Sequence, residues 1–275
     1  MMRLSAIGCW GGSPRVGGAC AGYLVECGRD AVLLDCGPGV CATLPRVRAL
    51  TDVDEVVVSH AHYDHVSDAG ALMYARLVHR QLGMTTRDLT FHAPAACGRD
   101  ELARLAMPGA SRVIGVEAGD EVRVGGLRVA TRLTSHPVPC LALRVSDETG
   151  ATLGYTADGA LTDDLASFLA GVDVLVTECS LYPGYDGRAM GHMSCDDVIE
   201  LQRASRPAHL LLTHLPIYGD PAEMLSRVRG AVTGATVDIA CPAASHGVSD
   251  IGPRAAAREV RGIVTMDVAA AGAPA

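Results

Sequence analysis

The segment Ser-His-Ala-His-Tyr-Asp-His at residues 59–65 places four side chains that commonly bind metals within six residues. It follows a short apolar run at residues 56–58, which predicts a buried strand. Because alternate residues of an extended chain face the same side, His60 and His62 can point at one spot. Asp64 and His65 belong to the turn that follows. Imidazole and carboxylate groups together suit Zn²⁺ or a similar divalent ion, whereas a solvated histidine-rich loop is the plain alternative.

Four ligands cannot fill two metal sites, so this interpretation requires further ligands downstream. Three later segments each place one such residue directly after an apolar, strand-like run, and these residues are His136, Asp158 and His214. Loops at strand ends commonly build functional sites on a rigid scaffold. Any one of these residues alone is more typical of a turn or a cap. As a set that follows the cluster, they predict a metal centre.

The order HxHxDH, then His, Asp and His, resembles the metallo-β-lactamase-fold superfamily over residues 1–241. The resemblance implies an α/β fold, a four-layer αβ/βα sandwich, with two divalent metal ions between the edges of its sheets. It implies three groups of ligands: His60, His62 and His136 for one ion, Asp64, His65 and His214 for the other, and Asp158 as the bridge. It also implies that Asp35 orients the histidine loop without binding metal itself.

Two more segments resemble the RNase Z-like branch of that superfamily: GCWGGSP at residues 8–14 and GHMS at residues 191–194. The resemblance places His192 against the reacting group, where it would donate to the anionic transition state or to the leaving oxygen. Ser194 and Asp197 also form a capping pair for a helix at 195–205, and both interpretations can hold together. Glu178 is a candidate to orient His192, or else an ordinary strand-end residue.

Three aromatic residues are candidates for the substrate pocket. Tyr182 and Tyr185 lie in the glycine- and proline-containing segment between Glu178 and His192, which suits a loop that contacts the substrate or an ordinary surface loop. Trp10 is the chain's single tryptophan and lies in the glycine-rich turn. For Trp10, the sequence favours a role in the pocket and a place in the core equally.

Composition excludes several classes of protein. The 275-residue chain has a net charge of −8 and lacks any apolar run of membrane-spanning length, which argues against nucleic-acid and membrane partners. The first residues reach glycine too early for a signal peptide, so we expect a soluble, cytoplasmic protein with reduced cysteines. The absence of lysine and asparagine indicates a GC-rich bacterial genome.

The RNase Z enzymes carry a long tRNA-gripping arm between the equivalents of His136 and Asp158. Only 21 residues separate them here, so the arm is missing. Proteins that grip polynucleotides neutralise phosphates with basic side chains, and the arginines of this chain are dispersed. tRNA is therefore not the expected partner. A small phosphodiester or a neutral ester fits better.

The sequence thus predicts a dinuclear metal-dependent hydrolase. A phosphodiesterase that acts on a cyclic phosphate or nucleotide ester through a metal-bridging hydroxide is the leading interpretation. A hydrolase of carboxyl esters, thioesters or lactones is the alternative, and a non-catalytic metal-binding protein is the third. Zinc is the expected metal, with manganese and iron as alternatives. Besides His192, Asp64 is a catalytic candidate, because its charge offsets the cations and sets the acidity of the water. A homodimer is typical of the branch.

The chain is expected to form one domain over residues 1–243, with a strand-rich first part and a regularly alternating second part that suggest two sheets. Residues 244–275 are dominated by alanine, glycine, proline and arginine. This composition predicts a partly disordered tail, in which residues 261–266 can add an edge strand.

Overall fold

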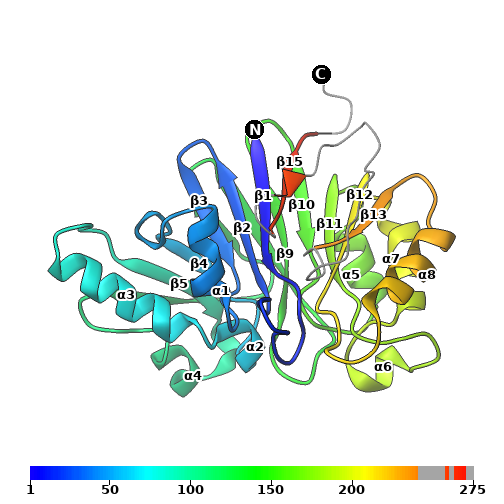
Figure 1. Ribbon diagram of the computed structural model, residues 1–275, viewed down its shortest axis with the longest axis horizontal. Coiled ribbons are helices and arrows are strands. Elements are labelled where there is room, and N and C mark those ends of the chain that lie inside the picture. The colour runs from blue at the N-terminus through cyan, green and yellow to red at the C-terminus, as the bar shows by residue number, and fades with distance from the viewer. Residues whose placement is uncertain (241–257, 260–262, 271–275) are drawn as a thin grey trace.

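The computed structural model describes residues 1–240, 258–259 and 263–270. These residues form two β-sheets that pack face to face, with helices α1 to α4 on one outer side and α5, α7 and α8 on the other (Figure 1). One sheet has the strand order β14-β15-β1-β2-β3-β4-β5-β6, and the other has the order β13-β12-β11-β10-β9-β8-β7. The expected αβ/βα sandwich is confirmed.

The elements have the following bounds. The first sheet contains β1 (Met2–Gly8), β2 (Gly22–Cys27), β3 (Asp30–Leu34), β4 (Glu55–Val57), β5 (Leu89–Pro94), β6 (Ser111–Val116), β14 (Arg258–Glu259) and β15 (Val264–Val268). The second contains β7 (Glu121–Val124), β8 (Leu127–Leu133), β9 (Leu141–Ser146), β10 (Thr152–Tyr155), β11 (Val174–Glu178), β12 (His209–Thr213) and β13 (Thr236–Ile239). The helices are α1 (Val40–Thr43), α2 (Tyr63–Val66), α3 (Ala69–Gln81), α4 (Arg99–Ala103), α5 (Asp163–Phe168), α6 (Gly187–Met190), α7 (Cys195–Ser205) and α8 (Pro221–Ala231).

Strand β2 shows why the first sheet is apolar on both faces. Tyr23 and Val25 belong to the core that joins the two sheets, whereas Leu24 belongs to a second core that includes residues of the helices on the outer side. Successive side chains of a strand point to opposite faces, so a strand covered on both sides needs a continuous apolar run instead of alternation. This double cover keeps the strands rigid up to the ends from which the loops of the site emerge.

The parallel strands set the position of those loops. In the first sheet β3, β4 and β5 run parallel, and in the second β10, β11 and β12 do the same. The carboxyl ends of parallel strands meet at one edge of a sheet. The histidine loop at residues 59–65 follows β4, Asp158 follows β10, and His214 follows β12. The residues that the sequence places after separate strands therefore gather in one region.

The described part of the predicted tail belongs to the domain. Strand β15 pairs antiparallel with β1, and β14, not β15, forms the edge of the sheet. Ile263, Met266 and Val268 are buried. The segment of the tail in which the sequence allows a strand therefore does form one, at residues 264–268, and its apolar side chains cover the core beside β1. The expected disorder at 244–257 and 271–275 lies outside the described residues.

Helix α7 begins where the sequence predicts. Ser194 Oγ accepts a hydrogen bond from Asp197 N, and Asp197 Oδ2 accepts one from Ser194 N at 2.8 Å. This capping box satisfies two backbone donors that the first turn would otherwise leave unpaired. Within the part of the chain that the structure describes, no helix is both long and apolar enough to cross a membrane.

Candidate metal centre

The shape of the histidine loop is set by Asp35, a buried carboxylate at the end of β3. Its Oδ1 accepts a hydrogen bond from Ser59 N at 2.7 Å, and its Oδ2 accepts one from Ser59 Oγ at 2.8 Å. The same Oδ2 lies 2.7 Å from His65 Nδ1 and 2.8 Å from Tyr155 Oη. Bonded in this way, His65 keeps its Nδ1 occupied and turns its Nε2 toward the cluster, which is the orienting contact that the resemblance implies.

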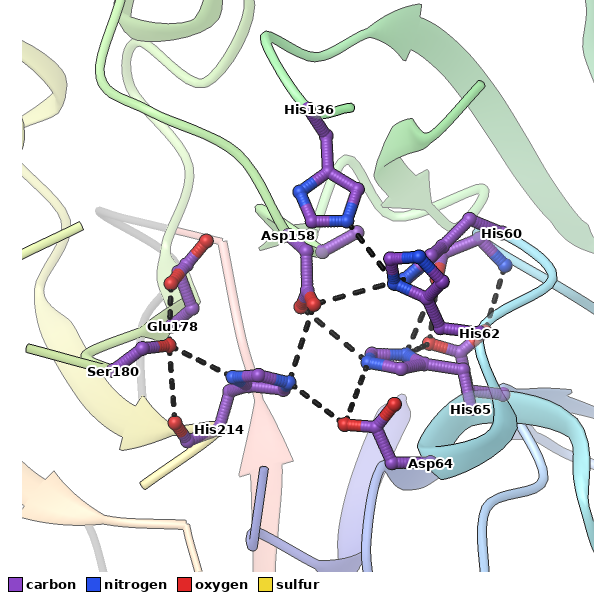
Figure 2. A network of polar contacts seen from close by, with 12 residues as sticks. His60, His62, Asp64, His65, His136, Asp158, Glu178, Ser180 and His214 are labelled. Carbon is purple, nitrogen blue, oxygen red and sulfur yellow. Dashed lines mark hydrogen bonds and ion pairs between the residues drawn. The ribbon is translucent and has the colours of Figure 1, made fainter. Parts of the chain in front are cut away.

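The first group of ligand atoms comes from three histidines. His62 Nδ1 lies 3.0 Å from His60 Nε2 and 3.2 Å from His136 Nε2. Asp158 Oδ2 lies 3.6 Å from His60 Nε2. The four ligand atoms all lie within 4.8 Å of one another (Figure 2). Three ring nitrogens that converge on one point cannot all form hydrogen bonds with one another. A cation between them would bind the lone pairs of all three.

The second group lies on the other side of Asp158. His214 Nε2 is 3.0 Å from Asp64 Oδ2 and 3.2 Å from Asp158 Oδ2. Asp158 Oδ1 is 3.4 Å from His65 Nε2. Asp158 therefore faces both groups, as Figure 2 shows.

Two buried atoms in this second group lack a hydrogen bond to any described residue: His65 Nε2 and Asp158 Oδ1. Buried polar atoms nearly always have a partner, and these two are aimed at the space between the ligands. Imidazole nitrogens and carboxylate oxygens are the donors that divalent metals such as zinc take. The described residues therefore fit a pair of metal ions.

Electrostatics favour the same conclusion. Burial and the positive field of His65 hold the pKa of His60 well below its ordinary value, so its imidazole is neutral, the form that binds metals. Burial raises the pKa of Asp158, but His214 and His65 outweigh it and hold this pKa well below its usual range. The pKa of Asp64 is also lowered, against burial, by its contact with His214. His60 thus offers a neutral imidazole, and Asp64 and Asp158 offer ionised carboxylates. Against the effect of burial, Asp158 raises the pKa values of His65 and His214, so a bound cation would take the place of the protons on these two rings.

Glu178, at the end of β11, connects the cluster to His192. Its buried carboxylate accepts hydrogen bonds from Gly159 N at 2.6 Å, Met193 N at 3.1 Å and Ser180 Oγ at 2.5 Å, and its Oε2 lies 3.1 Å from His192 Nδ1. The structure therefore pairs Glu178 with His192, the first of the two alternatives left open by the sequence. Burial lowers the pKa of His192, but the hydrogen bond to Glu178 outweighs it and raises this pKa to about 9.

His192 itself lies against the ligand cluster. Its ring stacks on that of His214, with centroids 5.5 Å apart and planes 18° from parallel, and meets the His136 ring edge-on at 5.2 Å. Asp158, His192 and His214 also form a group with ligand atoms within 4.8 Å of one another. All the residues that the sequence nominates as ligands, together with His192, are thus brought into one place.

Several supporting contacts were not foreseen from the sequence. Ser180 Oγ lies 2.8 Å from His214 Nδ1 while it donates to Glu178, so one carboxylate holds two histidines. Gly12 N donates to Asp64 Oδ2 at 2.7 Å, and His136 Nδ1 donates to the Gly191 carbonyl at 3.0 Å. Of these contacts, only the one between Ser180 and Glu178 could have been inferred from the sequence. Ser180 lies two residues after Glu178, so both side chains face the same side of an extended chain.

The glycine-rich turn at residues 8–14 is explained by a close approach to His214. A Cβ atom on Gly11 would lie 2.6 Å from atoms of the His214 ring, closer than van der Waals contact allows. The turn can therefore lie against the ligand cluster only if this residue is glycine.

The aromatic candidates have a different outcome. Trp10 is 6% exposed and packs in the core, with the Arg15 guanidinium 4.3 Å above its ring, as the core alternative expects. A role for Trp10 in the pocket stays a prediction. Tyr182 packs near Tyr218, with ring centroids 6.0 Å apart, and Tyr185 is 51% exposed. Among the described residues, neither tyrosine forms a hydrogen bond or a ring contact with a ligand, so their role in the pocket stays a prediction.

Comparison with known proteins decides the family. A family model described as a beta-lactamase superfamily domain matches residues 30–215. The chain belongs to the metallo-β-lactamase superfamily. Within it, the chain is 33% identical to the probable metallo-hydrolase YhfI of Bacillus subtilis, over 79% of this chain and 88% of that protein. The crystal structure of YhfI superposes with a TM-score of 0.83 and 30% identity, over 87% of this chain and 96% of that one.

More distant matches include a ribonuclease and a diphosphatase. Ribonuclease Z of Metallosphaera sedula is 23% identical over 83% of this chain and 94% of its own length. A diphosphatase from the PhnP family shares the fold, with a TM-score of 0.68 and 16% identity, over 86% of this chain and 94% of that one. The superfamily assignment and the likeness to YhfI support a metal-dependent hydrolase.

Proposed function

We propose that this protein is a two-metal hydrolase of small phosphodiesters. The observation that carries the proposal is the convergence of two ligand groups on the shared carboxylate of Asp158, with His192 stacked beside them. In the proposal, the metal ligands are His60, His62, Asp64, His65, His136, Asp158 and His214. When bound, the two ions supply an activated water and positive charge at the scissile phosphate. Zinc is favoured over manganese or iron because imidazole predominates among the ligands.

The residues of the chain divide the remaining tasks. Asp35 and Ser180 hold His65 and His214 by their Nδ1 atoms, so that the Nε2 atoms are directed at the cluster. Glu178 bonds His192 Nδ1, which leaves His192 Nε2 as the atom that can donate a proton to the leaving oxygen. The carboxylate of Asp64 offsets positive charge next to the reacting group.

A small substrate is favoured by the segment between His136 and Asp158. This segment forms β9 and β10, and its 21 residues hold no inserted arm. The net charge of −8 is also unsuited to a polynucleotide. The two relatives named above that act on RNA or on diphosphates favour a phosphate bond over a carboxyl ester, thioester or lactone, which remains the alternative function.

The test is hydrolysis of bis(4-nitrophenyl) phosphate by protein loaded with zinc, with the bound metal counted by mass spectrometry. We expect release of nitrophenolate that stops when a chelator removes the metal and resumes when zinc is restored. A carboxyl ester and a thioester are assayed in parallel. Protein that carries two metal ions, leaves the phosphodiester intact and hydrolyses an acyl substrate would contradict the proposal in favour of the alternative.

Replacing His192 by alanine is expected to keep both metal ions and to lower kcat by roughly 10²–10⁴-fold, the range typical of general acid–base groups. Because the role of His192 is to protonate the leaving oxygen, the loss should be larger for an alkoxide leaving group than for 4-nitrophenolate. The measurement is kcat for two phosphodiesters that differ only in the leaving group, with metal content determined in each preparation.

The matched control is His209→Ala, at the beginning of β12 and away from the ligand cluster, which should change neither kcat nor metal content. Full activity of His192→Ala, or an equal loss for both leaving groups, would remove His192 from protonation of the leaving oxygen.

A further inference from the structure

A cavity of about 310 Å³ lies beside the histidine loop, outside the cluster of ligands. Its walls come from the ends of β4 and β5 and from helices α2, α3 and α4, which lie next to one another in Figure 1. Its interior is formed by small and branched apolar side chains: Val58, Ala61, Ala69, Ala93, Leu102 and Leu105. This volume is at the lower end of the range for small-molecule sites, which are concave and mostly apolar.

The cavity and the ligand cluster share a wall. Ala61 lies between His60 and His62, and alternate residues of an extended segment face opposite sides. The two histidines are directed at the cluster, whereas Ala61 lines the cavity. Cys97, which also lines the cavity, has its Sγ 3.9 Å from the Pro139 carbonyl oxygen, in the segment that follows His136. The wall is therefore one residue thick at Ala61.

Polar groups of the cavity lie at its mouth. Glu101 and Arg104 are exposed, and Tyr63, which follows His62 directly, is 74% exposed. Among the lining residues, none of the buried ones is charged. A charged or strongly polar ligand would lose its hydration inside without gaining a partner, so the interior suits an apolar group. The mouth at Tyr63 lies beside the loop that carries the ligands.

We propose that this cavity is a specificity subsite, which takes an apolar part of the substrate, a ring or a short branched hydrocarbon group attached to the non-leaving side of the phosphodiester. The inference rests on the proposed function and adds a class of substrate to it. The position of Ala61 favours this occupant, because Ala61 lines the cavity and its two neighbours in the sequence, His60 and His62, belong to the ligand cluster.

Gly70 provides the variant that isolates the subsite. It lines the cavity from the first turn of α3, and a Cβ atom added there would meet no atom within 4 Å. Gly70→Phe is designed to place a ring at the open side of the cavity, and its Cβ atom displaces no packed atom, while Gly70→Ala adds a single carbon. Both replacements favour the helix over glycine, so neither is expected to impair folding.

The experiment measures KM and kcat of the zinc-loaded protein for 4-nitrophenyl alkyl phosphates with methyl, butyl, hexyl and phenyl groups. All of these release the same 4-nitrophenolate. For the unaltered protein and for Gly70→Ala, we expect KM to fall by roughly fourfold per added methylene until the cavity is full, with kcat unchanged. In Gly70→Phe this dependence should disappear, while the methyl ester is hydrolysed as before. The proposal would be overturned if KM did not change with the size of the alkyl group, or if KM depended on that size equally in all three proteins.

A second measurement needs no turnover. Binding of cyclohexanol to the same three zinc-loaded proteins is followed by ligand-observed nuclear magnetic resonance. Binding that Gly70→Phe removes and Gly70→Ala retains supports the subsite even if the phosphodiesters prove not to be substrates. Absence of binding overturns it. Cyclohexanol that binds but does not compete with the hexyl ester would also overturn it, in favour of a separate site for a second molecule.

Discussion

Replacing Asp158 by alanine is expected to leave at most one divalent ion bound per chain and to lower turnover by roughly 10³-fold or more. Among the described residues, this carboxylate faces both sets of ligands, with Oδ2 3.6 Å from His60 Nε2 in the first group and 3.2 Å from His214 Nε2 in the second. Its loss removes a negative charge that both ions share. Metal ions contribute several kcal/mol to stabilisation of the transition state, which corresponds to the expected loss of rate.

Metal content by mass spectrometry and kcat with bis(4-nitrophenyl) phosphate test this prediction in the same preparations. Asp158→Asn is the isosteric variant, which keeps the shape but lacks the charge, and it should lose most of the activity as well. Asp164→Ala, at an exposed carboxylate that pairs with Arg132, is the control and should change neither quantity. An Asp158→Ala protein that holds two ions and turns over normally would show that the ions do not depend on the shared carboxylate.

The second large effect concerns stability. Asp35→Ala is expected to lower the free energy of unfolding by about 3–5 kcal/mol, the usual effect of removing one partner from a buried charged pair. The carboxylate is fully buried and accepts hydrogen bonds from Ser59 N, Ser59 Oγ and Tyr155 Oη, besides its contact with His65. Alanine would leave these donors without an acceptor in a region that water does not reach.

Urea unfolding of the chelated protein measures this effect without the contribution of bound metal. Asp35→Asn should lose less, because it keeps one acceptor oxygen, and Asp52→Ala at an exposed position should change the free energy by less than about 0.5 kcal/mol. If Asp35→Ala unfolds at the same urea concentration as the unaltered protein, the hydrogen bonds of Asp35 do not hold the loop.

The ligand set could be predicted because each of its members follows a strand. His136, Asp158 and His214 are far apart in the sequence, but the strands that they follow run through one pair of packed sheets. Apolar runs identify such strands, and the ends of parallel strands meet. The position of a ligand-type residue after a strand was therefore enough to predict the cluster.

The backbone at the site could not be predicted in the same way. Asp35, Ala157 and His214 have φ angles of 61°, 50° and 50°, in the left-handed region that residues other than glycine rarely adopt. Aspartate and histidine are enriched in that region but still rare there, and alanine is not enriched, so local preference does not predict this conformation. The surrounding contacts impose the conformation, and it is set by tertiary structure. The link from Ser180 to His214 depends on the same long-range geometry.

Two features could be predicted only in part. The sequence indicates a possible strand within residues 261–266, but it does not show that this strand pairs with β1 at the other end of the sequence. Trp10 lies in a turn beside the ligands, yet its side chain is turned into the core and covered by Arg15. Neither the non-local pairing nor the direction of one side chain leaves a signal in a local window of sequence.

The pairing of β1 with β15 also determines the stage of synthesis at which the first sheet can be completed. Ser5 on β1 lies opposite Thr265 on β15, 260 residues later, so β1 is synthesised long before its neighbour exists. Until residue 268 has left the ribosome, one side of β1 offers unpaired backbone groups to any other extended chain. We therefore expect the nascent protein to depend on chaperones or on rapid translation until β15 has been synthesised and can pair with β1.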